Sequence, residues 1–167
     1  MTSPYLRDER AGDADAVRHV LQEAFRNHPH SSGRESLLVD ALRESKALDV
    51  ALVVEVDGIV VGHIAFSKVT IAGTFCGWYG LGPIAVLPAY QSRGIGSTLI
   101  REGLERLQSQ GAAGCVVLGE PGYYGRFGFK VRPGLELEGV PVEYFLAMSF
   151  DGSEPQGLVK YRPEFAE

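Results

Sequence analysis

The sequence predicts a mixed α/β (α+β) fold with a mostly antiparallel twisted sheet and one central parallel β-α-β crossover. Residues 51–66 alternate with a period of two around Asp57-Gly58, and this dipeptide between β-rich runs is a strong hairpin signal. A second glycine turn at residues 72–74 leads into residues 75–86, so three consecutive antiparallel strands are expected. Residues 81–107 then pass from an apolar strand through a glycine-containing loop into a helix with an apolar stripe. The short apolar run 114–118 follows, and a strand-helix-strand order of this kind predicts a parallel strand pair.

A short strand and two helices are expected before the hairpin. Residues 4–7 are typical of a strand, and Asp13 stands where it can cap the first helix. The apolar residues of that helix recur at helical spacing: Val17, Val20, Leu21, Ala24 and Phe25. The segment 27–30 ends it at a proline, and Ser32 with Glu35 has the pattern of a capping box for the second helix. The expected buried face of the second helix consists of Leu37, Leu38, Ala41 and Leu42.

The third strand of the meander, residues 75–86, contains three glycines and Pro83. Glycine weakens strand pairing and proline removes a ladder donor, so this strand is expected to be bulged or closely approached by another backbone or a ligand. Gly111 is a helix stop signal. Residues 142–150 predict a long final strand, and residues 159–161 predict either an edge strand or a packing segment.

Length and charge favour one ordinary globular domain over residues 1–167. The chain has 16 Lys and Arg against 21 Asp and Glu, a net charge of −5, and its basic residues are dispersed, which argues against a nucleic-acid partner.

Cys76 and Cys115 both lie in apolar runs, as buried free cysteines do, and suggest a reducing cytoplasm. The N-terminal stretch lacks a signal-peptide core, and no apolar run approaches the roughly 18 residues of a membrane span. His28 and His30 lack the further ligands of a metal set, so no metal is expected.

Three anion-binding patterns compete for residues 87–98. A Walker loop would need a lysine after the glycine, whereas Gly96 is followed directly by Ser97. A dinucleotide fingerprint needs a tighter strand-to-loop turn and a third glycine where Leu99 stands, although Glu120 lies near the place of a ribose-binding acid. The third pattern, Gln/Arg-x-x-Gly-x-Gly/Ala, fits Gln91 to Gly96.

On that motif the sequence resembles the GNAT superfamily of acyl-CoA-dependent N-acetyltransferases. Tyr124-x-x-x-Gly128-Phe129 looks like the superfamily's second landmark. The stretches GPIAVLPAYQSRGIG, VVLGEPGYYGRFGF and GLVKYRPEF are similar to its YhbS-type branch. The resemblance extends over nearly the whole chain and is least specific before residue 50.

The resemblance implies acetyl-CoA as the co-substrate. The pyrophosphate would rest on the loop and the positive end of the following helix, on Gln91, Ser92, Arg93, Gly94, Ile95, Gly96 and Ser97. The pantetheine arm would bind the backbone of Ile84, Ala85 and Val86. The Val86 N–H would hold the developing oxyanion of the thioester carbonyl.

The resemblance also implies that Tyr124 is the general acid for the departing thiolate, although Tyr123 is its immediate neighbour. Many superfamily members carry a glutamate base on the strand that matches residues 78–86, and none is present here. Glu120 is the nearest carboxylate in sequence to Tyr124. The alternatives are His63, Glu35, Asp40 and a water-mediated base.

The expected activity is direct transfer of an acetyl group from acetyl-CoA to a primary amine of a small molecule or peptide. The first alternative is a non-catalytic acyl-CoA-binding or regulatory domain, which the absence of an obvious base keeps open. A dinucleotide-binding protein is a weaker third alternative. No nucleic acid or membrane is expected as a partner, and association into homodimers is common among such domains.

Overall fold

The computed structural model describes residues 3–26 and 33–166. The chain groups into two compact units, residues 1–66 with 83–103 and residues 67–82 with 104–167. Each unit is described by itself, and the single domain expected over residues 1–167 stays a prediction.

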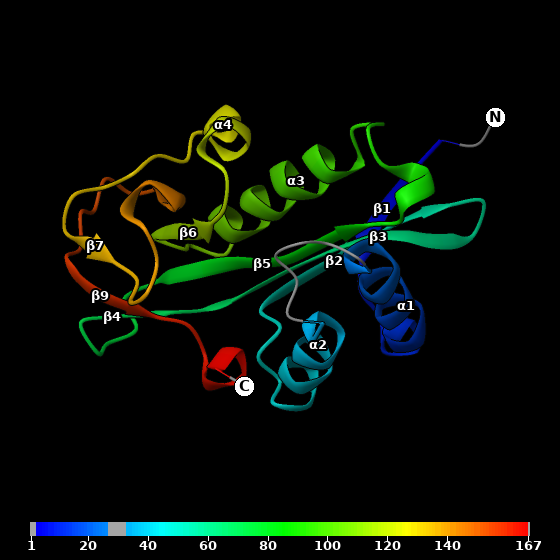
Figure 1. The fold of residues 1–167 in the computed structure, drawn as a ribbon, viewed down its shortest axis with the longest axis horizontal. Helices are drawn as coiled ribbons and strands as arrows, with labels where there is room; N and C mark the ends of the chain where they lie inside the picture. The colour runs from blue at the N-terminus through cyan, green and yellow to red at the C-terminus, as the bar shows by residue number, and fades with distance from the viewer. Residues whose placement is uncertain (1–2, 27–32, 167) are drawn as a thin grey trace. The chain divides into compact units, whose positions relative to one another are not determined.

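The first unit is a sheet with helices on both faces (Figure 1). Its elements are β1 (Tyr5–Asp8), α1 (Ala14–Phe25), α2 (Glu35–Glu44), β2 (Val50–Val56), most of β3 (Ile59–Lys68), the end of β5 (Trp78–Val86) and the first part of α3 (Ile95–Ser109). The pairs β1–β2 and β2–β3 are antiparallel. The Leu87 N–H donates to the Val61 carbonyl at 2.8 Å, which holds the end of β5 beside β3.

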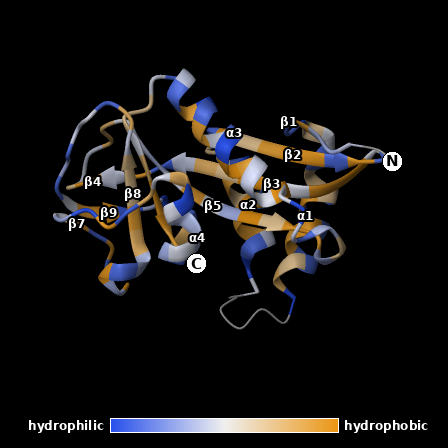
Figure 2. Ribbon diagram, turned by 90° about the horizontal axis from the view of Figure 1, so that it is seen from above, coloured by the Kyte–Doolittle hydropathy of each residue, from blue (hydrophilic) through white to orange (hydrophobic). Residues whose placement is uncertain are grey.

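The hairpin between β2 and β3 forms as the sequence predicts. Asp57 and Gly58 have φ of 53° and 77°, the two positive values of a type I′ turn, whose twist matches that of the strands it joins. Both strands are strongly apolar, as their orange colour in Figure 2 shows. The predicted antiparallel hairpin at Asp57-Gly58 is therefore confirmed.

Helices α1 and α2 lie side by side and share one core with the sheet. That core consists of Val17, Val20, Leu21, Val39, Val53, Val60 and Ala85. In α2 the buried positions are Ser36, Val39 and Leu42, which recur every three residues. Leu37 is 57% exposed, so its assignment to the buried face was wrong. The adjacent leucines at 37 and 38 suggested a broad buried face of α2. Because α1 lies beside α2, only the narrower stripe of residues 36, 39 and 42 is buried.

Helix α3 packs closely against β3 at two glycines of the first unit. A Cβ on Gly62 would lie 3.0 Å from Cγ2 of Ile95, and a Cβ on Gly103 would lie 2.2 Å from the Phe66 ring. Side chains at these positions would push the helix away from the strand. The two glycines therefore set the position of α3 and of the loop that precedes it.

In the second unit, β5 pairs in parallel with β6 (Gly114–Leu118), and β6 pairs antiparallel with β8 (Phe145–Ser149). The combined strand order is β1-β2-β3-β5-β6-β8. The parallel crossover from β5 through α3 to β6 is thus confirmed. Helix α3 ends in a Schellman motif at Gly111, with φ of 83° and the Ala112 N–H donating to the Leu107 carbonyl at 3.0 Å.

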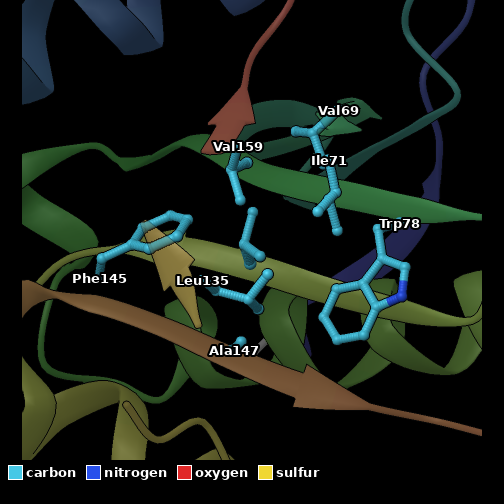
Figure 3. Packing of buried hydrophobic residues seen from close by; sticks show 8 residues of the cluster. Val69, Ile71, Trp78, Leu135, Phe145, Ala147 and Val159 are labelled. Atoms are coloured by element: carbon cyan, nitrogen blue, oxygen red, sulfur yellow. The ribbon is translucent and has the colours of Figure 1, made fainter. Parts of the chain in front are cut away.

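A second, three-stranded sheet in this unit has the order β4-β9-β7. Its strands are β4 (Thr70–Ile71), β9 (Gly157–Lys160) and β7 (Leu135–Glu136). Side chains from both sheets form one core, in which Val159 points between Phe145 and Trp78 (Figure 3). A Cβ on Gly114 would lie 2.5 Å from the indole ring of Trp78, so this glycine admits the largest side chain of the core.

Four local expectations need correction. Cys76 is exposed and lies outside any strand, because the turn after β4 extends to residue 77. Residues 142–144 form a 3-10 turn, and only Phe145–Ser149 is strand. The tail strand β9 is central in its sheet because β4 and β7 pair with its two edges. Asp13 precedes α1 but makes no side-chain cap.

The Asp13 carboxylate accepts hydrogen bonds from residues that precede α1. Arg7 Nη1 donates to Oδ2 of Asp13 at 2.7 Å, and the Arg10 N–H donates to the same oxygen at 2.6 Å.

Ser32, the predicted cap of the second helix, lies outside the described residues. None of the helices that the structure describes is long and apolar enough to cross a membrane.

Candidate active site

The loop between β5 and α3 has the geometry of an anion cradle. A 3-10 turn, Pro88–Tyr90, follows the strand, and Ser92 and Gly94 then take positive φ values of 63° and 82°. Alternation of this kind exposes successive backbone N–H groups. Helix α3 starts at Ile95 with no acidic residue in its first turn. Because the first four N–H groups of a helix lack intrahelical partners, this end can bind a negatively charged group.

Side chains of the loop stabilise this conformation. Gln91 Nε2 donates to the Val86 carbonyl at 2.9 Å, which ties the loop back to the end of β5. Thr98 Oγ1 donates to the Gly94 carbonyl at 3.0 Å. The Arg93 guanidinium stacks over the Tyr90 ring at 5.2 Å from its centroid, so a positive charge lies beside the loop.

The Val86 backbone faces the edge of β5 that is turned away from β3. Consecutive residues of a strand direct their N–H groups to opposite edges, and the Leu87 N–H is bound to Val61 on β3. The Val86 N–H and carbonyl therefore point to the other edge, where Gln91 occupies the carbonyl. Gly82, earlier in the same strand, has a φ of 150° that glycine favours, and Pro83 follows it.

Tyr124 lies in the second unit, at the end of the short helix α4 (Pro121–Tyr124). A Cβ on Gly119 would lie 2.3 Å from the Tyr124 ring, so the ring fits against the chain only because residue 119 has no side chain. The ring makes an edge contact with Phe129, with 6.0 Å between centroids. Burial, with smaller contributions from Tyr123 and Cys115, raises the pKa of Tyr124 to about 12. The phenol is therefore protonated at neutral pH.

Tyr123 has different surroundings. Its side chain is 36% exposed, and the Arg126 guanidinium lies 4.7 Å from its ring centroid. Arg126 Nε also donates to the Tyr123 carbonyl at 3.3 Å. The adjacent tyrosines, which sequence alone could not distinguish, are thus a surface cation-π partner and a half-buried phenol.

The four candidate bases, Glu120, Asp40, Glu35 and His63, have different surroundings. Glu120 is exposed and directly precedes α4, where its carbonyl accepts from the Tyr124 N–H at 3.0 Å. Asp40 pairs with Arg18 and Arg43, each at 2.9 Å. Glu35 borders a small cavity of about 260 Å³ with α1 residues.

His63 is fully buried, with its Nε2 3.2 Å from Oε1 of Glu9. Burial alone would raise the pKa of Glu9, but His63 and Arg43 outweigh it and hold the pKa below its usual value. Glu9 also accepts a hydrogen bond from Arg43 at 2.8 Å. Asp40, Arg43 and Glu9 are therefore bound into an ionic network of the first unit, and the buried His63 ring lies beside it.

Four residues that shape the surroundings of the glycine loop and of Tyr124 were not predicted from the sequence: Gly62, Cys115, Gly119 and Tyr161. The glycines carry no chemistry and follow no motif, so only the close contacts reveal them. Cys115 was expected to be buried, and it is, but its influence on Tyr124 depends on tertiary packing. Among the described residues no group of three or more His, Cys, Asp or Glu is placed to hold a metal. His28 and His30 lie outside those residues.

Comparison with known sequences places these features in a family context. A family model described as the acetyltransferase (GNAT) family matches residues 14–129. The N-acetyltransferase YhbS of Escherichia coli strain K12 is 38% identical over 127 residues, which are 75% of this chain and 73% of YhbS. A second N-acetyltransferase of the same strain, YjhQ, is 37% identical over 134 residues, 79% of this chain and 71% of YjhQ.

Two solved structures share the whole fold. A GNAT family acetyltransferase from Brucella melitensis, in complex with acetyl-CoA, superposes with a TM-score of 0.89 at 49% identity over 99% of each chain. YhbS from Escherichia coli, in complex with CoA, gives a TM-score of 0.92 at 32% identity over 100% of this chain and 94% of YhbS. The mixed α/β architecture expected from the sequence is therefore confirmed.

Proposed function

Because this chain belongs to the acetyltransferase (GNAT) family, we propose that it transfers the acetyl group of acetyl-CoA directly to a primary amine of a small molecule or peptide. The relative from Brucella melitensis was solved with acetyl-CoA, and Escherichia coli YhbS with CoA. We extend that ligand to this chain because the loop geometry of the first unit suits a pyrophosphate.

In this proposal the backbone of Ile84, Ala85 and Val86 binds the pantetheine arm, and residues 91–97 bind the pyrophosphate. The positive φ values of Ser92 and Gly94 support the loop assignment, since they turn backbone N–H groups outward. The outward edge of Val86 supports its role as the oxyanion donor. A fixed N–H dipole stabilises developing negative charge without a proton transfer.

The proposed reaction needs a general acid that protonates the departing CoA thiolate. The amine nitrogen forms a bond to the acetyl carbon, the carbon–sulfur bond breaks, and the CoA thiolate takes the phenolic proton of Tyr124. The resulting phenolate recovers a proton from the acylated nitrogen, so the amide and free CoA leave an unchanged enzyme. The amine enters as the neutral form, after its ammonium proton has passed to bulk water directly or through Glu120, which releases it to water.

The single observation that carries the catalytic proposal is the state of Tyr124. By its sequence motif it resembles the family's acid, its ring is held against Gly119 and Phe129, and its phenol carries a proton to give at neutral pH. A binding domain without catalysis would need no such phenol. Glu120 is proposed as the base only because it is an exposed carboxylate that immediately precedes α4.

An acetylation assay across a panel of primary amines tests the function. Because an exposed thiol such as Cys76 would add to the signal of a thiol reagent, the products should be followed by chromatography of the acetylated amine and CoA. Amine-dependent release of CoA is the expected result. Binding of acetyl-CoA without transfer to any amine would instead favour the regulatory domain, and no binding would reject both.

The proposed setting is the cytoplasm, without nucleic acid or a membrane as partner. The buried free thiol of Cys115 is compatible with a reducing compartment. A homodimer is proposed from the family resemblance alone. Sedimentation of the purified chain measures this state directly, and a monomer at assay concentration would reject it.

A further inference from the structure

The second unit contains an apolar cavity that no part of the proposed reaction uses. Its volume is about 680 Å³, within the usual range of small-molecule pockets. The apolar side chains that line it come from β5, β6, β9 and the segments after β7 and β9: Leu81, Leu118, Leu137, Leu158, Tyr161 and Phe165. Leu118 is 49% exposed and Leu158 is 37% exposed, so the cavity can be entered from solvent.

Among the described residues that line this cavity, Tyr161 carries a buried hydroxyl without a partner. Its ring packs over β5, where a Cβ on Gly80 would lie 2.5 Å from the ring atom Cε2. Its hydroxyl is buried and has no hydrogen-bond partner among the described residues. Buried polar groups without a partner are rare in folded proteins, and a phenol here has the capacity to bind one polar group of a ligand.

The Tyr161 hydroxyl also belongs to the region of the proposed acid. Burial raises the pKa of Tyr161 well above its usual range, and Cys115 and Tyr124 add to the rise. The geometry agrees: the Tyr161 ring packs on Gly80 of β5, which pairs with Val116 next to Cys115, and the Tyr124 ring packs on Gly119 just after β6. The two phenols and the thiol therefore lie around one stretch of β6 within the second unit.

We propose that this cavity binds the apolar body of the amine acceptor, while the Tyr161 hydroxyl forms a hydrogen bond with the amine. The inference rests on the proposed acetyl transfer and names its acceptor class as a primary amine attached to an alkyl chain or aromatic ring. A neutral amine donates to, or accepts from, a phenol hydroxyl. An open apolar wall with one unpartnered hydroxyl suits a molecule with one polar end.

The charges around the cavity argue against a polyamine. Among the described lining residues Glu138 is the one carboxylate, and Lys160 lines the same cavity. Arg162, a third charged lining residue, is paired with Glu164 at 3.1 Å. A polyamine would bring several cations to a wall with little negative charge, which costs desolvation energy without compensation.

The test combines a binding measurement with an activity measurement on the whole protein. Calorimetry with hexylamine and ethylamine reports the cavity without any need for acetyl transfer. Each methylene that enters the cavity should improve affinity by about fourfold, so the four additional methylenes of hexylamine should make it bind about 250-fold more tightly than ethylamine. In the acetylation assay kcat/KM should follow the same order.

Two variants and one control locate the effect. Leu158→Lys places a cation in the apolar wall opposite Glu136 of β7 and should weaken hexylamine binding by about tenfold or more, with ethylamine little changed. Val142→Lys, at a residue 65% exposed and outside the cavity lining, should change neither. Tyr161→Phe should raise KM for both amines by about tenfold while kcat is retained, because it removes one hydrogen bond to the amine.

The outcomes separate this inference from the function. If hexylamine binds as expected but no amine is acetylated, the cavity assignment stands and the acetyl transfer fails. If amines are acetylated with equal kcat/KM regardless of apolar length, or only within lysine peptides, the cavity assignment is overturned. It is also overturned if Leu158→Lys impairs hexanoyl-CoA as a donor but leaves hexylamine unaffected, since the cavity then holds the acyl chain.

Discussion

Single residues give the two adjacent tyrosines different surroundings. Tyr124 is packed against Gly119 and Phe129 and remains protonated, whereas Tyr123 carries Arg126 on its exposed ring. A phenyl ring at either position preserves most of the packing. Removal of one hydroxyl therefore tests the proposed proton-donating function of Tyr124 apart from its packing.

Tyr124→Phe should lower kcat by about a hundredfold or more, the usual contribution of a general acid, with CoA affinity nearly unchanged. The matched control is Tyr123→Phe, which should retain wild-type kcat. Steady-state kinetics and CoA calorimetry measure the two effects. Because the pKa of Tyr124 is about 12, ionisation of this phenol should cause no loss of wild-type rate below about pH 11. An unchanged kcat in the Tyr124→Phe variant would remove Tyr124 from the mechanism.

Asp13 shows a residue-scale effect on stability. The Arg7 guanidinium beside Asp13, together with the Arg10 N–H and against the effect of burial, lowers the pKa of this carboxyl from 3.8 to about 2. A lowered carboxyl pKa stabilises the fold above the unfolded value, and this stabilisation disappears as pH falls from about 4 towards 2.

Asp13→Asn should therefore lower the free energy of unfolding by about 2 kcal/mol at pH 7. The difference from wild type should shrink as pH falls through 3, because wild-type Asp13 then becomes protonated. Urea unfolding at both pH values measures it. Asp15→Asn, at a side chain 96% exposed in the first turn of α1, is the control and should have little effect. A difference independent of pH would contradict the ionic account.

At the scale of elements, a glycine with a similar positive φ lies next to each end of α3. Gly94 has a φ of 82° in the loop before α3, and Gly111 has a φ of 83° after its last turn. A side chain in this left-handed region costs about 1–2 kcal/mol at either position. The ends differ in polarity, since only the N-terminal end favours an anion.

Gly94→Val and Gly111→Val should therefore destabilise the protein by similar amounts but differ in CoA binding. Gly94→Val should weaken CoA affinity by about tenfold or more, because it crowds the approach of the pyrophosphate and removes at least one charged hydrogen bond. Calorimetry with CoA and thermal unfolding separate the two effects. Equal CoA affinity in both variants would refute the loop as the pyrophosphate site.

At the scale of the whole molecule, the two cysteines report global unfolding. Cys76 is exposed, while Cys115 is completely buried in β6, where burial raises the pKa of its thiol. A disulfide-exchange reagent attacks the thiolate, so a buried thiol with a raised pKa is unreactive until the chain opens.

One thiol should react rapidly in the native protein, and the second should react only at the rate of unfolding. Cys76→Ser should abolish the fast phase and leave the slow phase, which rises with urea as the protein unfolds. Spectrophotometric titration with such a reagent follows both phases. Fast reaction of both thiols in native buffer would show that β6 opens without global unfolding.

The sequence by itself determined the order of the main elements, the hairpin turn and the glycine loop, because these follow from local rules. Period-two alternation, Asp57-Gly58 and the glycine spacing act within a few residues of the chain. The motif also indicated the family, which the comparisons bear out.

Only the tertiary structure decided which side chains meet. It made Leu37 and Cys76 exposed, placed β9 at the centre of a second sheet, and distinguished Tyr124 from Tyr123. It also gave Tyr161 an apolar cavity and a hydroxyl with no partner among the described residues. These features depend on packing between segments far apart in sequence, where burial and neighbouring groups set exposure and pKa, and no local pattern encodes them.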